Sequence, residues 1–165
     1  MYKRQDEDIT YVRKALSGYR NVYILSDTLT KVQVNSLIKA VDVFVSLHRA
    51  EGFGLVLAEA MLNGTPTIAT NWSANTEFAC SEAACMVGYK MVEIEKDIPP
   101  YKKGYHWADA DVDEAAGFME RLYSDRDFYD SIAENGARYV RESLNMERST
   151  KIVKERVENI RRKLC

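Results

Sequence analysis

Several residue types that would define a functional class are scarce in this sequence of 165 residues. Its three cysteines, Cys80, Cys85 and Cys165, form neither a CxxC pair nor an even set, and it has only two histidines. Zinc sites need cysteines and histidines at close, paired spacing, and a disulfide framework needs cysteines in pairs. We therefore expect no metal site and no disulfide, and we interpret the cysteines as small thiols in a reducing compartment.

The sequence also lacks an excess of charge of one sign and any long hydrophobic run. Its formal net charge is -2, which gives no reason to expect nucleic-acid binding. The longest apolar stretch, from Phe53 to Leu62, is interrupted by Gly54 and Glu59 and is far too short to cross a membrane. Residues 1–10 lack the apolar core of a secretory signal. We expect a cytoplasmic protein.

Strand-like and helix-like segments alternate along the first half of the chain. The pattern predicts helices over residues 8–18, 30–40 and 54–62, and strands at Tyr23–Ser26, Val43–Leu47, Thr67–Ala69 and Cys85–Val87. The strand within residues 41–47 is apolar enough to be buried on both faces. Such alternation implies right-handed crossovers and a parallel sheet with helices on both faces. The sequence therefore predicts an α/β fold, a Rossmann-like three-layer domain.

The second half of the chain has a different pattern. Residues 89–108 contain two prolines, a glycine and clustered tyrosines and lysines, which predicts a long ordered loop. From Asp113 onward the pattern is helical. In the last helix, apolar residues recur at Val153, Val157, Ile160 and Leu164 and so form a stripe along one face. We expect this stripe to fold onto its own domain, to pair with a second copy, or to fray.

The most informative segment is Ser46–Met61, which leads from a strand through a glycine turn into a helix. Open α/β sheets bind ligands at this position, beyond the carboxyl ends of the strands. Gly52 and Gly54 allow close approach of the backbone, and the unpaired N–H groups of a helix start bind phosphate. An anionic ligand is the expectation.

Two glutamates flank this helix start, Glu51 before it and Glu59 within it. Glu59 lies among apolar residues, where a charge needs a partner. That partner is either the helix dipole with local N–H groups, or ligand hydroxyl groups. Because carboxylates accept hydrogen bonds from vicinal hydroxyls, the spacing would let one glutamate bind each ring of a diphosphate-linked sugar and ribose.

The stretch EGFGLVLAEAMLNGTPTIAT resembles the E-x7-E signature of the retaining family 4 glycosyltransferases, the group 1 glycosyltransferases of GT-B architecture. The likeness continues through VYILSD and VDVFVSLH upstream, and through NWSANTEF, CMVGY and WADADVDEAA downstream. It implies that residues 1–165 form the C-terminal, donor-binding domain of such an enzyme. It also implies that the domain is truncated at its N-terminal side and lacks the acceptor-binding lobe.

The resemblance also implies roles for individual residues. Glu59 would bind the ribose hydroxyls. Glu51, the residue that we single out as catalytic, would bind the hydroxyls of the transferred sugar. The backbone at Gly52, Phe53, Gly54 and Leu55 would bind the diphosphate and sugar.

Four further positions are expected at the substrate site. Ser26 and Asp27 end the strand whose following loop meets the base in the family. His48 and Arg49 precede the motif, and Arg49 either adds positive charge near the phosphates or is a solvated loop arginine.

The resemblance implies an activity for the parent protein. It would transfer a hexose, with retention of configuration, from a UDP-, GDP- or ADP-linked donor to a glycan or lipid-linked acceptor, without metal or other cofactor. Such enzymes of polysaccharide biosynthesis are cytoplasmic or peripheral to the inner face of the membrane. The chain alone is expected to be inactive. The alternative is a non-catalytic sugar-nucleotide-binding or interaction module, and we also consider self-association through the C-terminal helix.

Three other features of the sequence need an interpretation. Asp109-Ala-Asp111 resembles a metal-binding DxD, but it directly precedes a helix, where aspartate is a favoured cap. The loop with Trp72, Ser73, Ala74, Asn75 and Glu77 follows a strand and could border the sugar. Four aromatic residues form either an acceptor wall or packing within the domain: Tyr89, Tyr101, Tyr105 and Trp107. A generic dinucleotide-binding domain is disfavoured because no GxGxxG follows the first strand.

Overall fold

The computed structural model describes residues 2–164, with side chains described from Ile9 to Lys163. The chain divides into two compact units, Met1–Val34 and Asn35–Cys165, which are considered separately.

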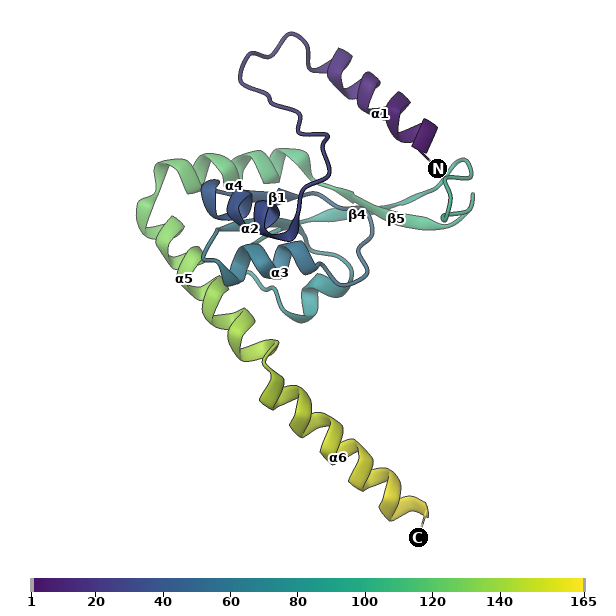
Figure 1. Ribbon diagram of the computed structural model, residues 1–165, viewed down its shortest axis with the longest axis vertical. Coiled ribbons are helices and arrows are strands. Elements are labelled where there is room, and N and C mark those ends of the chain that lie inside the picture. The colour runs from purple at the N-terminus through teal and green to yellow at the C-terminus, as the bar shows by residue number, and fades with distance from the viewer. Residues whose placement is uncertain (1, 165) are drawn as a thin grey trace. The chain divides into compact units, whose positions relative to one another are not determined.

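The first unit contains helix α1 (Tyr2–Ala15), followed by an extended segment (Figure 1). The prediction of a strand at Tyr23–Ser26 is wrong, because these residues join no β-ladder in the part of the chain that the structure describes. Strand-forming residue types are not sufficient for a strand, which is stabilised by hydrogen bonds to a neighbour. The side chains of Tyr23 and Leu25 are accordingly exposed, at 86% and 66%.

Helix α2 (Lys31–Ala40) begins with the expected cap. The Gln33 amide donates to the Thr30 hydroxyl at 3.3 Å, while the Thr30 amide donates to the Gln33 side chain at 2.9 Å. This reciprocal pair is a capping box, which satisfies two of the otherwise unpaired N–H groups at the helix start.

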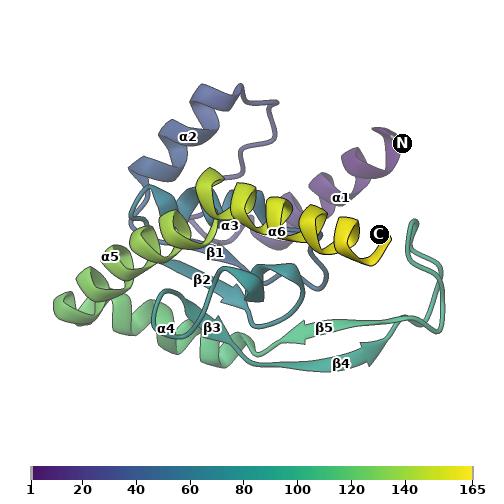
Figure 2. The same ribbon diagram turned by 90° about the horizontal axis from the view of Figure 1, so that it is seen from below.

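The second unit is built on a parallel sheet of three strands, β1 (Phe44–Ser46), β2 (Thr67–Thr70) and β3 (Cys85–Val87), in the order β1-β2-β3 (Figure 2). Helix α3 (Leu55–Leu62) connects β1 to β2. The predicted α/β fold with a parallel sheet is confirmed. The central strand β2 is wholly buried, but Val45 of β1 is 39% exposed because β1 is an edge strand. The predicted burial of residues 41–47 on both faces is therefore wrong.

Each face of the sheet carries its own core. On one face α3 contributes Leu57 and Met61, which pack with Phe78. On the other, α4 (Val112–Ser124) contributes Leu122, which packs with Ile68 of β2. Helix α5 (Arg126–Ser143) joins both layers, giving Val140 to the first core and Ile132 to the second. The three-layer prediction is confirmed.

Residues 89–108 do not form a loop, and that prediction is wrong. Strands β4 (Tyr89–Glu93) and β5 (His106–Ala110) pair as an antiparallel hairpin, with Tyr89 opposite Ala110 (Figure 2). The prolines and the glycine lie only in the tip, where Gly104 has a φ of 86°. Breaker residues therefore mark the turn of the hairpin and leave its strands intact.

Short polar contacts fix the helix starts. Asp111 caps α4, since its carboxylate accepts from the amides of Asp113 and Glu114 at 3.1 and 3.0 Å, which confirms the capping interpretation of the Asp109-Ala-Asp111 segment. Asp125 likewise accepts from the Phe128 amide at 2.9 Å.

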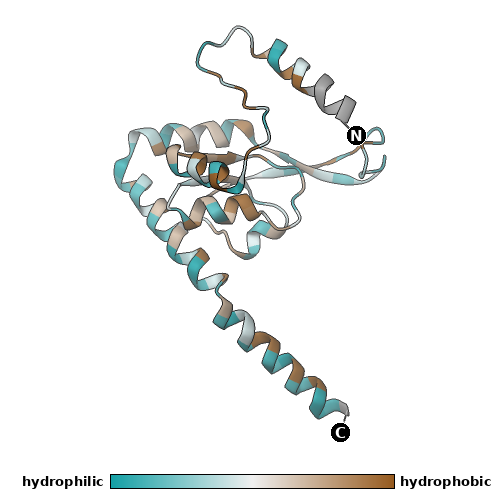
Figure 3. Cartoon of the chain, in the orientation of Figure 1, coloured by the Kyte–Doolittle hydropathy of each residue, from teal (hydrophilic) through white to brown (hydrophobic). Residues whose placement is uncertain are grey.

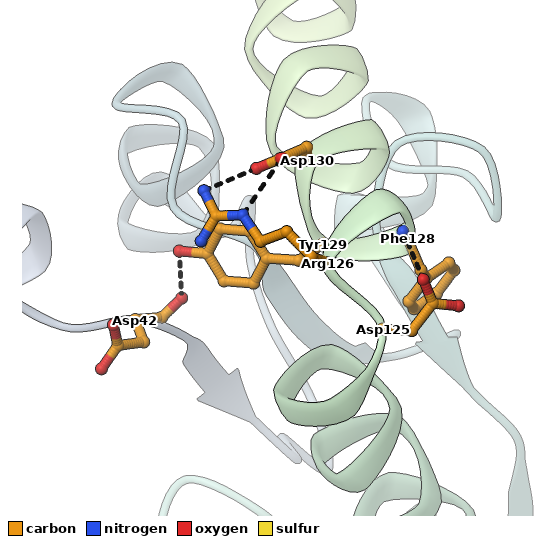
Figure 4. A network of polar contacts seen from close by, with 6 residues as sticks. All are labelled: Asp42, Asp125, Arg126, Phe128, Tyr129 and Asp130. Atoms are coloured by element: carbon orange, nitrogen blue, oxygen red, sulfur yellow. Dashed lines mark hydrogen bonds and ion pairs between the residues drawn. The ribbon is translucent and has the colours of Figure 1, made fainter.

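Figure 4 shows how α5 is tied to the start of the sheet. The Tyr129 hydroxyl donates to the Asp42 carbonyl at 3.0 Å, just before β1, while Arg126 pairs with Asp130 one turn along the same helix at 2.8 Å. The Tyr129 contact links helix α5 to the segment that leads into β1, whereas the Arg126–Asp130 pair lies within α5.

The last helix, α6 (Met146–Leu164), carries the predicted apolar stripe (Figure 3). Val153, Val157 and Ile160 remain 60%, 43% and 44% exposed, so the stripe is not folded onto the core of its own domain. The side chain of Leu164 lies outside the described residues. Within the described part of the chain, no helix is both long and apolar enough to span a membrane.

Two cysteines lie in the described residues, and both are free. Cys85 is buried in β3, and burial raises the pKa of its thiol to about 11, although Arg121 acts in the opposite direction. The thiol is therefore protonated at neutral pH, as expected for a small core residue.

Candidate functional site

The site is built where β1 ends and α3 begins. Gly54 precedes the helix with φ 89° and ψ 44°, in the left-handed region that favours glycine. A Cβ at this position would lie 3.0 Å from Leu57 Cδ1 and 3.3 Å from Phe78 Cζ. Gly54 offers no side chain to cap α3, so the amides of the first turn are left for another acceptor.

A hollow of about 430 Å³ lies against this helix start. It is lined by Phe44, Ser46, Glu51, Gly52, Phe53, Gly54, Leu55, Val56 and Leu57. Its position at the carboxyl end of a parallel strand, beside uncapped amides, suits a ligand with an anionic group.

Glu51 is held by its backbone. The Glu51 amide donates to the Ser73 hydroxyl at 3.3 Å, and the Glu51 carbonyl accepts from the same hydroxyl at 2.5 Å. The Glu51 carboxylate accepts from the Phe53 amide at 3.3 Å. The glutamate predicted to bind the sugar is thus joined to the loop after β2.

His48 is also joined to that loop. Its Nε2 lies 3.0 Å from the Trp72 carbonyl and 3.2 Å from Asn75 Oδ1. The Trp72 carbonyl is an acceptor. Asn75 Oδ1 is an acceptor too, because the Asn75 amide nitrogen donates to the Thr70 carbonyl at 3.0 Å. We therefore assign the proton of the neutral imidazole to Nε2. The Ser46 hydroxyl lies 3.4 Å from Nδ1. In this arrangement His48 connects two strand ends.

Arg49 points toward the hairpin. Its guanidinium pairs with Asp109 at 2.5 Å and lies 5.0 Å from the centre of the Trp107 ring, while its carbonyl accepts from the Ala108 amide at 3.0 Å. Both charged side chains are about half exposed, so the ion pair itself stabilises the fold little. The contact does, however, direct the positive charge to Asp109, and a phosphate would compete with that carboxylate.

Glu59 lines a second and larger hollow of about 810 Å³. Its wall is formed by Phe53, Leu55, Ala58, Glu59, Leu62, Val140, Arg141, Leu144, Asn145 and Ser149. Phe53 and Leu55 also line the hollow beside Glu51. The two glutamates of the motif therefore face neighbouring hollows that share part of one wall.

Ser26 and Asp27 belong to the first unit, where the Arg13 guanidinium donates to the Ser26 hydroxyl at 3.0 Å. Their expected contact with the base remains a prediction.

The loop after β2 could be predicted near the site from the sequence, but Arg141 and Leu144 could not. Arg141 belongs to α5, and Leu144 directly follows that helix. Nothing in their local pattern distinguishes them from other helix surface residues. Two aromatic pairs pack within the domain, since the ring centres of Tyr101 and Trp107 lie 5.8 Å apart and those of Trp72 and Tyr89 lie 5.1 Å apart. Tyr105 is instead 58% exposed.

Comparison with known proteins identifies the family. The family described as "Glycosyl transferases group 1" matches residues 14–139. The chain therefore belongs to the group 1 glycosyl transferases. A comparison with curated protein sequences finds no match.

Solved structures share the fold. The C-terminal domain of the group 1 family protein LpcC from Francisella tularensis is 20% identical with a TM-score of 0.61, over 87% of this chain and 64% of that one. HepE from Anabaena, in complex with UDP and glucose, is 17% identical with a TM-score of 0.68, over 96% of this chain and 38% of that one. Sucrose-phosphate synthase from Thermosynechococcus elongatus is 19% identical with a TM-score of 0.67, over 95% of this chain and 34% of that one. The chain thus spans about one to two thirds of the length of these structures.

Proposed function

We propose that this chain binds the nucleotide-sugar donor of a glycosyl transfer reaction. The observation that carries the proposal is the helix start at Gly54, which leaves amides uncapped beside a hollow that also holds the carboxylate of Glu51. The diphosphate would accept hydrogen bonds from these amides, and the positive end of the helix dipole would stabilise its charge.

The two glutamates would bind the two rings of the donor. Glu51 would accept hydrogen bonds from the sugar hydroxyls, and Glu59 from the ribose hydroxyls in the adjoining hollow, where Phe53 and Leu55 supply apolar surface. UDP-glucose is the first donor to test, because the similar HepE structure was also determined with UDP-glucose.

For the whole protein we propose retaining transfer of a hexose to a glycan or lipid-linked acceptor without a metal. Protein groups would orient the donor and acceptor and stabilise the leaving diphosphate. The acceptor would bind a second lobe facing the carboxyl ends of the strands. We further propose a cytoplasmic location, at the inner face of the membrane where the acceptor is lipid-linked.

Replacing Glu59 with alanine is expected to weaken binding of free UDP by about fivefold or more, because hydrogen bonds from the ribose to a carboxylate are lost. Glu51→Ala should leave the affinity for UDP unchanged and weaken only the affinity for UDP-glucose. NMR titration of the chain measures these affinities even where they are weak.

The matched control is Glu134→Ala, since Glu134 is an exposed glutamate of α5 outside both hollows. Circular dichroism would verify that each variant is folded. Equal affinity of wild type and Glu59→Ala for UDP would show that this carboxylate does not bind the ribose.

A further inference from the structure

Ser73 has an unusual backbone conformation. Among the described residues it is the one non-glycine residue with a positive φ, at 79°, and its ψ is -162°. This region is populated almost only by glycine, and another residue keeps this strained conformation only where surrounding contacts enforce it. Glycine would adopt this conformation without strain. We therefore expect the Ser73 hydroxyl to make hydrogen bonds that offset the strain.

Within the part of the chain that the structure describes, the Ser73 hydroxyl has one partner residue, Glu51, which it contacts twice. It donates to the Glu51 carbonyl at 2.5 Å and accepts from the Glu51 amide at 3.3 Å. A single side chain thus satisfies both backbone polar groups of Glu51. Thr76 in turn holds Ser73, because its hydroxyl and its amide donate to the Ser73 carbonyl at 2.8 and 3.3 Å.

The consequence concerns the position of the Glu51 carboxylate. Glu51 lies in a turn between β1 and α3, so no sheet ladder fixes its backbone. The contact with Ser73 fixes it instead, from the loop that follows the neighbouring strand β2. His48 links the same two segments through Trp72 and Asn75, whereas the contacts with the Glu51 backbone come from Ser73.

We propose that Ser73 is a positioning residue, which sets where the Glu51 carboxylate lies relative to the start of α3 and thereby determines how tightly the sugar of the donor is bound. The inference rests on the proposed function. Because Ser73 acts through the sugar-binding glutamate, it should affect the sugar part of the donor and leave the nucleotide part unaffected.

The test compares Ser73→Gly and Ser73→Ala with wild type. Both variants lose the hydroxyl, but glycine also removes the backbone strain, so Ser73→Gly should retain more stability to urea than Ser73→Ala. Without ligand, the Glu51 amide should exchange with solvent faster in both variants. With ligand, both should lose about fivefold or more of the affinity for UDP-glucose while keeping the wild-type affinity for UDP.

A merely structural role would make affinity follow stability, so Ser73→Gly would then bind UDP-glucose better than Ser73→Ala. That outcome, or a wild-type ratio of UDP-glucose to UDP affinity in Ser73→Gly, would overturn the inference. Ser81→Ala, at an exposed serine after the same loop, is the control and should change neither affinity. GDP-mannose with GDP and ADP-glucose with ADP serve as further probe pairs. If the wild-type chain binds neither member of any of these pairs, the proposed function itself is refuted.

Discussion

Replacing Phe78 with alanine is expected to lower the free energy of unfolding by about 3–5 kcal/mol, because a fully buried ring is removed from the core. Phe78 is 0% exposed and packs in the cluster that joins α3 to the sheet. Its ring centre lies 5.2 Å from that of Phe53, a residue that lines both hollows of the site. The same change should therefore loosen the turn before α3.

Urea unfolding followed by circular dichroism measures the effect. Phe78→Leu is the matched variant, since it keeps most of the apolar volume, and it should cost less than about 1.5 kcal/mol. If Phe78→Ala does not fold, the leucine variant still tests the argument. Equal losses of stability in a folded alanine variant and the leucine variant would contradict the role given to the ring.

The elements around the motif could be predicted because their signals are local. A β-branched run, two glycines and an apolar helix specify β1, the turn at Gly54 and α3 without information from distant residues. The first turn of α4 was equally predictable, since Asp111 caps it from within three residues. Local patterns of this kind also placed Glu51 beside the helix start.

The failures concern pairing between distant segments. Tyr23–Ser26 has strand-forming residues but no neighbour to pair with in the described chain, and residues 89–108 pair with each other across a tip that contains all of their breaker residues. The site shows the same limit. Arg49 is directed to Asp109, sixty positions away, and α5 supplies Arg141 to the hollow beside Glu59. Such contacts depend on the assembled fold, so no local pattern reveals them.

The packing of α5 against α3 gives the second large effect. Gly136 is buried in α5, and a Cβ there would lie 2.8 Å from the backbone carbonyl oxygen of Ala83 and 3.7 Å from Met61 Cβ. The first distance is shorter than real Cβ contacts allow, and the atom it meets is backbone, which cannot rotate away. The helix must therefore shift, and overpacking of this kind costs about 1–3 kcal/mol.

Gly136→Ala is expected to lower the free energy of unfolding by up to about 2 kcal/mol, because alanine recovers about 1 kcal/mol of the packing cost through its higher helix propensity. Gly117→Ala separates the two contributions. Gly117 lies inside α4, is exposed, and has no atom within 4 Å of an added Cβ. There the propensity gain acts alone, so Gly117→Ala should raise stability by about 0.5–1 kcal/mol. Urea unfolding of both variants should give changes of opposite sign. A stabilising Gly136→Ala would mean that α5 packs less closely on Ala83 than the structure shows.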